Sequence, residues 1–367
     1  MQAALALARE LLARLTPLAE TSGDEARTAG LMAEFLAGLN PTRLLTGLGG
    51  HGVLAEFAGR APGPCLLWRA ELDAVCAADG APAHLCGHDG HLAILAGLAA
   101  HLARNPPARG KVLLACQPAE ETGQGAAAFL ADPRLTGLAV DRALALHNLP
   151  GLELGRVVCR AGAMNCASVG LAARLTGAAS HAAYPEQGRS PAPVLARLLT
   201  DLPALAGWLN GFGLVTIVHA RLGRPTFGVN PGQAELMATL RADGDAGLAT
   251  LAATAAELVA TASREAGLEQ AIAWQDRFAA TVNHPQAAAA VARAAVSAGL
   301  PYQAAAAPFR WSEDFGAFCQ KWPGALLVLG AGPDCPPLHS ADYRFPPALL
   351  EPGLRLALAC VAECLAD

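Results

Sequence analysis

The stretch His84-Leu85-Cys86-Gly87-His88-Asp89-Gly90-His91 places a thiol, several imidazoles and a carboxylate close together in the chain. Cys86 and His88 are two residues apart, so in an extended segment their side chains leave the backbone on the same side. Gly87 between them carries no side chain and lets the backbone approach whatever those two groups bind. A thiolate and an imidazole held in this way form half of a transition-metal site, although a His-rich surface turn would have the same composition.

A helix is expected directly after this stretch. The residues from Gly90 to Leu102 are dominated by Leu and Ala, which predicts a buried helix. Asp89 is the expected N-cap, because a short carboxylate side chain can accept a hydrogen bond from the first turn. The side chains of Cys86 and His88 would then be fixed at the start of a helix.

Length, charge and cysteine content exclude several classes of protein. The chain has 367 residues, which favours two domains, and its net charge of -5 gives no basic surface for nucleic acid. The longest runs without a charged residue fall short of a membrane span, so no membrane partner is expected. Met1 to Leu15 predicts an amphipathic first helix rather than a signal peptide. Ten cysteines without a CxxC pair favour a reducing, cytoplasmic location.

Apolar runs alternate with helical stretches through the first part of the chain. The expected strands are Val53–Phe57, Cys65–Trp68, Lys111–Cys116 and Ala143–Leu146, and the expected helices are Gln2–Leu15, Asp24–Leu39, Gly90–Leu102 and Ala126–Leu130. Continuous apolar strands between helices predict an α/β domain with a mostly parallel sheet flanked by helices. In such sheets, functional groups gather beyond the carboxyl ends of the strands.

Polar residues follow three of these strands at that point. Asp73 comes after the second strand, Glu120 and Glu121 after the third, and His147 after the fourth. Each has an ordinary structural explanation, since the two glutamates could cap the next helix and a single histidine is often a core residue. Their joint placement beside Cys86 and His88 favours a functional site.

The pattern changes near residue 160. Half-exposed strands are expected at Ser168–Leu175 and Leu236–Arg241, with helices at about Pro193–Leu209 and Ala246–Ala266. This predicts a smaller α+β domain with an open sheet over residues 163–275, inserted into a first domain made of residues 1–162 and 276–367. The first domain resumes with a helix at Pro285–Gly299, a strand at Ala325–Leu329, His339 and a helix at Leu349–Leu365.

Several segments together give the chain a resemblance to a known family. They are Arg69-Ala-Glu-Leu-Asp73, Cys86-Gly-His-Asp-Gly-His91, Gln117-Pro-Ala-Glu-Glu121, Leu146-His147, Ser180-His-Ala-Ala183, Val229-Asn-Pro231, Ser312-Glu-Asp-Phe315 and Leu338-His-Ser340. In this order and over nearly the full length, the chain resembles the M20 metallopeptidase family. The resemblance is to its amidohydrolase branch, which includes aminoacylase, hippurate hydrolase and auxin-conjugate hydrolase.

The resemblance implies a catalytic domain with two divalent metal ions, Zn²⁺ or Mn²⁺ with Co²⁺ or Ni²⁺ also suited, and an inserted lid (dimerisation) domain that can form a homodimer. The residues it implies as metal ligands are Cys86, His88, Glu121, His147 and His339, with Cys86 bridging the ions. It implies Glu120 as general base, Asp73 as a residue that orients a ligand, His181 as a donor to the oxyanion, and Asn230 and Arg241 as contacts for a substrate carboxylate.

The resulting hypothesis is hydrolysis of the amide bond of an N-acyl amino acid or a similar small amide. Three alternatives stay open on the sequence. The same metals could act on dipeptides or on carboxyl-terminal residues. The chain could be an inactive relative that binds an acylated ligand. Cys86 could also be the nucleophile of a thiol hydrolase with His88 as its base.

Overall fold

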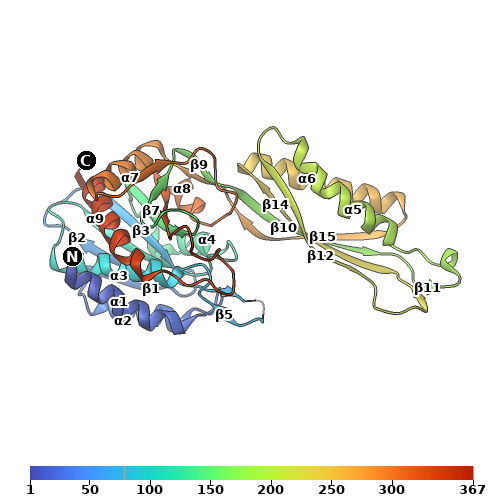
Figure 1. The fold of residues 1–367 in the computed structure, drawn as a ribbon, viewed down its shortest axis with the longest axis horizontal. Coiled ribbons are helices and arrows are strands. Elements are labelled where there is room, and N and C mark those ends of the chain that lie inside the picture. The colour runs from blue at the N-terminus through green and yellow to red at the C-terminus, as the bar shows by residue number, and fades with distance from the viewer. Residues whose placement is uncertain (78, 367) are drawn as a thin grey trace. The chain divides into compact units, whose positions relative to one another are not determined.

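The chain divides into two units in the computed structural model, which describes residues 1–77 and 79–366 (Figure 1). Unit 1 comprises Met1–Met164, Thr281–Ala307 and Glu313–Asp367, and unit 2 comprises Asn165–Ala280 and Pro308–Ser312. The long segment of unit 2 ends at Ala280, just after a strand that continues to Phe278.

Unit 1 is an eight-stranded sheet with helices. Its strand order is β1-β2-β6-β3-β7-β18-β8-β17. The strands of this sheet are β1 (Arg43–Leu48), β2 (Gly52–Ala58), β3 (Cys65–Glu71), β6 (Lys111–Gln117), β7 (Arg142–Leu149), β8 (Val157–Cys159), β17 (Tyr302–Ala304) and β18 (Gly324–Gly330). The central strands β6, β3, β7 and β18 are parallel, whereas β1 with β2, β2 with β6, and β18 with β8 pair antiparallel. The expected mostly parallel sheet of an α/β unit is confirmed.

Helices flank this sheet. They are α1 (Gln2–Leu15), α2 (Ala26–Ala37), α3 (His88–Arg104), α4 (Gly125–Leu130), α7 (Pro285–Ser297), α8 (Gly316–Lys321) and α9 (Leu350–Ala366). Short two-strand pairings are formed by β4 (Val75–Cys76) with β5 (Pro82–Ala83) and by β9 (Gly162–Asn165) with β16 (Thr281–Asn283). Single 3-10 turns occur at η1 (Thr16–Leu18), η2 (Pro133–Leu135) and η5 (Pro347–Leu349).

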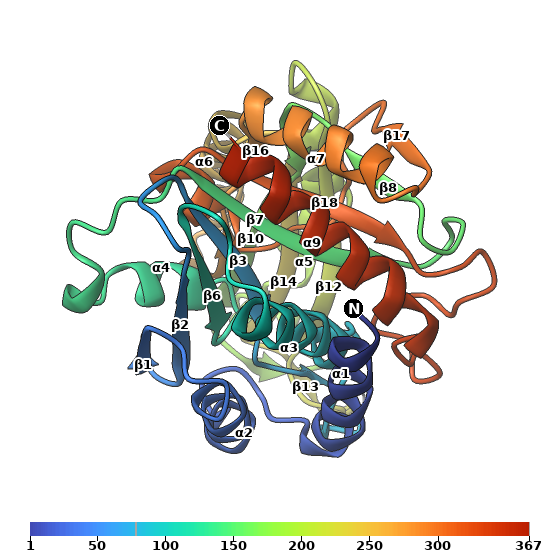
Figure 2. The same cartoon turned by 90° about the vertical axis from the view of Figure 1, so that its left-hand side faces the viewer.

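Helix α3 is the buried centre of the main core. It packs between α1, α9 and strand β3, and its residues from His88 to Ala100 are buried. Figure 2 shows α1, α3, α7 and α9 on one face of the sheet. Leu66 and Trp68 of β3 and Leu327 of β18 point into this core. The buried helix inferred from the Leu and Ala run is therefore present.

The start of α3 differs from the expectation. The helix begins at His88, its N-cap is Gly87 with φ of 96°, and Asp89 lies inside the first turn. The Asp89 carboxylate instead accepts hydrogen bonds from Thr16 Oγ1 (2.8 Å) and from the backbone of Gly90 (3.0 Å). Glycine adopts this left-handed backbone without strain, so the chain can enter the helix directly between Cys86 and His88.

Unit 2 is a four-stranded antiparallel sheet with helices on one face. The strand order is β12 (Gly213–Leu222), β14 (Gln233–Ala242), β10 (Ala167–Thr176) and β15 (Glu269–Phe278). The covering helices are α5 (Ala192–Ala204) and α6 (Asp245–Glu265). The remaining elements are β11 (Ser180–His181) paired with β13 (Val229–Asn230), and the turns η3 (Pro185–Gln187) and η4 (Leu205–Trp208).

Helix α6 is long and apolar enough to cross a membrane by length and composition. In this fold one of its faces is buried, and Leu248, Leu251 and Val259 on that face belong to the core between the helices and the sheet of unit 2. A single apolar face against a sheet is the pattern of a core helix in a globular unit.

Candidate metal centre

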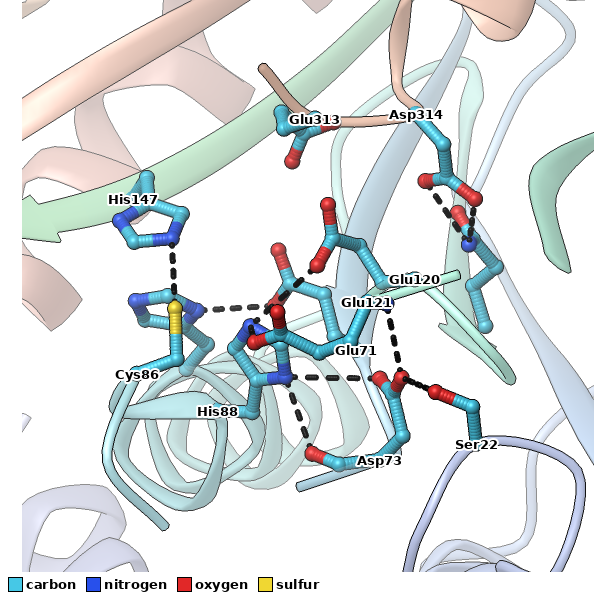
Figure 3. Close-up of polar contacts among 12 residues, drawn as sticks. Ser22, Glu71, Asp73, Cys86, His88, Glu120, Glu121, His147, Glu313 and Asp314 are labelled. Atoms are coloured by element: carbon cyan, nitrogen blue, oxygen red, sulfur yellow. Dashed lines mark hydrogen bonds and ion pairs between the residues drawn. The ribbon is translucent and has the colours of Figure 1, made fainter. Parts of the chain in front are cut away.

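The polar residues named from the sequence meet at the carboxyl edge of the parallel strands in unit 1. Asp73 follows β3, Glu120 and Glu121 follow β6, His147 lies near the end of β7, and His339 follows β18. Parallel neighbours present these ends to the same edge, which is where ligands bind in open α/β sheets. Cys86 and His88 reach the same place from the start of α3 (Figure 3).

Two groups of metal-binding atoms share one sulfur. Cys86, His88 and His147 form one group, and Cys86, Glu121 and His339 form the other, with the ligand atoms of each group within 4.8 Å of one another. Cys86 Sγ lies 3.4 Å from His147 Nε2. The first group offers two imidazoles and the sulfur, and the second offers a carboxylate, an imidazole and the same sulfur, donor types that suit divalent transition metals.

Unsatisfied buried atoms test whether cations fit these groups. His88 Nε2 and Glu121 Oε1 are buried and have no hydrogen-bond partner among the described residues. They lie 3.7 Å apart, which is too far for a hydrogen bond. A buried polar atom without a partner is costly, and a bound cation would satisfy both the ring nitrogen and the carboxylate oxygen. The donor set therefore fits divalent metal ions.

Protonation of the ligand candidates follows from their surroundings. Burial lowers the pKa of His147 to about 3, so its ring is neutral and keeps a lone pair for a metal. Burial also lowers the pKa of His88, but Glu71 and Asp73 raise it more, to about 10. Burial raises the pKa of the Cys86 thiol, and Glu121 adds to the rise. Of these two imidazoles, His88 is therefore the one that favours its protonated form.

Asp73 connects several parts of the site without facing the sulfur. Its Oδ2 accepts hydrogen bonds from Ser22 Oγ (2.7 Å) and from the backbone of Glu121 (2.9 Å). Its carbonyl oxygen is 2.9 Å from His88 Nδ1, so the opposite ring nitrogen is turned toward Glu120 and Glu121. Such contacts orient metal ligands, which is the role inferred for Asp73.

A buried cluster around Arg69 lies next to the proposed ligands. Its members stand in segments quoted above for the family resemblance, but no role for Arg69 followed from the sequence. Arg69 is fully buried and donates to Glu71, to Glu313 (2.9 Å) and to Asp314 (2.6 Å). Its Nε also donates to Gln117 Oε1 at 2.8 Å. The feature of the sequence that could have revealed this cluster is a charged residue inside an apolar strand. A guanidinium buried there must be paired with acidic groups.

The carboxylates outnumber the cations in this cluster. Burial raises the pKa of Asp314 to about 7, against the opposing effect of Arg69. Burial, Glu121 and Glu313 raise the pKa of Glu120 well above its usual value. Glu120, Glu313 and Asp314 present carboxylate oxygens within 4.8 Å of one another. Cations in the neighbouring groups would therefore stabilise the ionised forms of these clustered carboxyl groups.

The other residues named from the sequence belong to unit 2. His181 is exposed, and its Nδ1 accepts a hydrogen bond from the backbone of Ala183 at 3.1 Å. Asn230 donates to Ser180 Oγ at 3.1 Å across the β11–β13 pairing. Arg241 is half-buried and donates to Ser312 Oγ at 2.9 Å.

A sheet edge where two groups of candidate metal ligands share the Cys86 sulfur, beside the buried Glu120 carboxyl of raised pKa, is the kind of site that metal-dependent hydrolases use. The chain matches Peptidase family M20/M25/M40 over residues 67–363 and belongs to that family. It is 33% identical over 201 residues to the N-acetyl-L-cysteine deacetylase of Bacillus subtilis, covering 51% of this chain and 47% of that protein. It is 26% identical to the N-acetyldiaminopimelate deacetylase of Leuconostoc citreum, covering 82% and 81%.

The fold matches solved structures over its whole length. The Bacillus subtilis YXEP protein, described as a dinuclear metal-binding peptidase of the M20 family, superposes with a TM-score of 0.80 at 21% identity over 99% of both chains. The chain spans 47% of the N-acetyl-L-cysteine deacetylase and 40% of a Rhodococcus jostii protein named as a glutamate–cysteine ligase, to which it is 30% identical. The matched relatives named as deacetylases and amidohydrolases are hydrolases that act on amide bonds.

Metal binding is expected to release protons and to weaken as the pH falls. The raised pKa of the Cys86 thiol and the pKa of about 10 for His88 mean that both groups carry a proton that a metal must displace. The zinc dissociation constant should fall about tenfold per released proton for each pH unit gained. Chelator competition at several pH values, with calorimetry in buffers of different ionisation enthalpy, measures this. A dissociation constant that does not change with pH would contradict the ligand assignment.

Replacing Arg69 is expected to destabilise unit 1 strongly. R69M leaves Glu71, Glu313 and Asp314 buried without their cation, a loss of about 3–5 kcal/mol. R293M is the matched control, since Arg293 pairs with Glu363 at 2.8 Å on the surface of the same unit and should cost below about 1 kcal/mol. Urea unfolding of both variants measures the difference, and equal losses would argue against the buried cluster.

Proposed function

We propose that the chain is a metal-dependent amidohydrolase that cleaves the amide bond of an N-acyl amino acid or a similar small amide. The observation that carries the proposal is Glu120, a buried carboxyl group 3.8 Å from His88 Nε2 and next to Glu121 in the second ligand group. The relatives named as deacetylases of N-acetylated amino acids support this substrate class.

Cys86, His88, Glu121, His147 and His339 are the residues proposed to hold two divalent ions. When bound, such ions polarise the amide carbonyl and acidify water, which makes it a nucleophile near neutral pH. The thiolate of Cys86 favours Zn²⁺, while the carboxylate and imidazoles also suit Mn²⁺, Co²⁺ or Ni²⁺.

Glu120 is proposed as the group that moves the proton. The attacking water gives its proton to the Glu120 carboxylate as the oxygen bonds to the carbonyl carbon. Glu120 then passes that proton to the nitrogen as the carbon–nitrogen bond breaks, releasing a carboxylate and an amine. Burial, Glu121 and Glu313 raise the pKa of Glu120 in the metal-free site, and cations held by the neighbouring ligands would oppose that rise, so that Glu120 starts the reaction as a carboxylate.

Residues of unit 2 are proposed to contact the substrate. The exposed imidazole of His181 can donate a hydrogen bond to the oxyanion, which is worth on the order of 10²–10³ in rate for such a donor. Asn230 and Arg241 offer an amide and a guanidinium to the substrate carboxylate. Unit 2 is accordingly proposed as the lid of the catalytic unit.

The geometry favours a metal site over a thiol hydrolase. The Cys86 sulfur is buried and faces His147, whose pKa of about 3 makes it a weak base, and burial raises the pKa of the thiol itself. His88, the base in that alternative, is instead bonded to the Asp73 carbonyl. A reactive catalytic thiol needs a lowered pKa, so Cys86 is suited to metal binding.

We further propose a homodimer formed through unit 2, and a cytoplasmic location. Strand β12 is at the edge of its sheet, with Val218 58% and Leu222 40% exposed. An exposed apolar edge strand is a template for pairing with a second chain. All ten cysteines lie in the described residues and are free thiols, which suits a reducing compartment.

The E120Q variant tests the catalytic proposal. It removes the proton-accepting carboxylate but keeps the shape of the side chain, so turnover of N-acetyl and N-benzoyl amino acids should fall by roughly 10²–10⁴-fold. Zinc content by mass spectrometry should match wild type, and E10Q, at an exposed glutamate of unit 1, should keep full activity. Undiminished turnover in E120Q would exclude Glu120 as the base. If the protein cleaves free dipeptides faster than acyl amino acids, the proposed substrate class is wrong and the protein is a dipeptidase.

The V218K variant tests the dimer. A lysine on the exposed edge of β12 should oppose strand pairing by charge repulsion and give a monomer in analytical ultracentrifugation. V296K is the control, because Val296 is 71% exposed on α7 of unit 1. A wild-type protein that sediments as a monomer, or a dimer that V218K leaves intact, would reject this interface.

A further inference from the structure

Asn148, the residue after His147 on β7, is held at both ends of its side chain. It is fully buried. Its Oδ1 lies 2.7 Å from His91 Nε2, and its Nδ2 donates to the Tyr343 hydroxyl at 2.7 Å. A side-chain amide with both ends engaged has one orientation, so it forms a rigid surface beside a proposed ligand.

The backbone of Gly87 packs against the side chains of Asn148 and Tyr343. A Cβ placed on Gly87 would lie 2.3 Å from Asn148 Oδ1 and 2.6 Å from the Tyr343 hydroxyl oxygen. These distances leave no room for a side chain, so the backbone itself packs against the two polar groups. Because Cys86 and His88 flank Gly87, the same contact fixes the position from which both side chains extend toward the cation groups.

Tyr343 also ties the His339 segment to this place. Tyr343 is fully buried, and its backbone N–H donates to Ser340 O at 3.0 Å within the same turn. The backbone N–H of His339 donates to Leu85 O at 2.8 Å, directly before Cys86. The segment after β18 is therefore joined to the Cys86 segment on both sides, once through its backbone and once through the Tyr343 hydroxyl.

On its other side, Asn148 is connected through His91 to the buried ion pair of Glu71 and Arg69. His91 Nδ1 lies 2.8 Å from Glu71 Oε2, and Glu71 pairs with Arg69. The contacts run from Arg69 through Glu71, His91 and Asn148 to Tyr343, all of them buried. The Tyr343 hydroxyl is the last member of this chain, so its removal frees one end of Asn148 while the rest stays in place.

We propose that Tyr343 is a positioning residue of the metal centre, whose hydroxyl, acting through Asn148, fixes the Gly87 backbone and with it the separation of the Cys86 sulfur and the His88 imidazole. The inference rests on the proposed metal-dependent function, and it adds a residue that touches neither metal nor substrate. Groups that orient ligands in this way typically change metal affinity by about 10–100-fold when they are removed.

The test compares Y343F with Y302F in the full chain. Tyr302 is the control, because its hydroxyl makes one hydrogen bond in the same unit, donating to Cys159 O at 3.2 Å, away from the proposed ligands. Zinc affinity is measured by chelator competition, and site geometry by the thiolate charge-transfer band of the Co²⁺-substituted protein. Wild type and Y302F should bind two ions with the same affinity and spectrum, whereas Y343F should bind about 10–100-fold more weakly with a shifted band. Wild-type affinity and spectrum in Y343F would overturn the inference.

A double-mutant cycle tests the route through Asn148. If the hydroxyl acts through this amide, Y343F should cost little further affinity in an N148A background, whereas independent contributions would add and would overturn the route. Should Y343F fail to fold by circular dichroism, N148A alone carries the test, because it breaks the same contact and keeps the tyrosine ring.

Substitution of Gly87 tests the contact between the Gly87 backbone and the side chains of Asn148 and Tyr343. G87A would force a methyl group against Asn148 and Tyr343 and should lower zinc affinity and shift the Co²⁺ band. G137A is the matched control, since Gly137 has φ of +75° with nothing within 4 Å of its Cβ position, so it tests the backbone strain alone. Equal effects of the two variants would contradict the packing of Gly87 on the pair. Wild-type protein that binds no metal would instead reject the proposed function, whatever the variants do.

Discussion

Buried negative charge is the constraint on which the rest of unit 1 depends. Glu71, Asp73, Glu120, Glu313 and Asp314 are all buried at one edge of the sheet. An ionised carboxylate away from water costs several kcal/mol unless a cation or several hydrogen bonds compensate it. Arg69 compensates part of this charge, and the proposed metal ions would compensate the part near Cys86. The proposed cations would therefore stabilise the folded form of this edge, because they would compensate charge that folding buries.

The topology explains why so many charged groups can share this edge. The strands β6, β3, β7 and β18 are parallel neighbours, so residues distant in sequence leave the sheet side by side. The middle of each strand is apolar, and the buried polar residues of β3, β6 and β7 stand near the carboxyl ends. The apolar part builds the core against α3 and α9, and the polar ends stay beyond it. The fold therefore separates the groups that give stability from those that do chemistry.

The sequence predicted the buried elements well and the exposed ones poorly. Helix α1 was predicted with its observed bounds, Gln2–Leu15, and strands β2, β3, β6, β7 and β18 were found to within a few residues, whereas the short buried strand β8 was not predicted. The edge strands β12 and β15 were missed, because an exposed edge strand lacks the apolar alternation that identifies a strand. Asp89 was wrongly expected to cap α3, since the glycine turn that starts this helix depends on tertiary packing against Asn148 and Tyr343.

The site shows the same division between local pattern and tertiary contact. The residues proposed as ligands stand in short motifs, so a resemblance could point to them, whereas Arg69 meets Glu313 across 244 residues and no local spacing reveals that pair. All the proposed ligands and Glu120 belong to unit 1, while His181, Asn230 and Arg241 belong to unit 2. The proposed metal binding therefore rests on residues of unit 1 alone, and substitutions in unit 2 are expected to leave the charge balance around those residues unchanged.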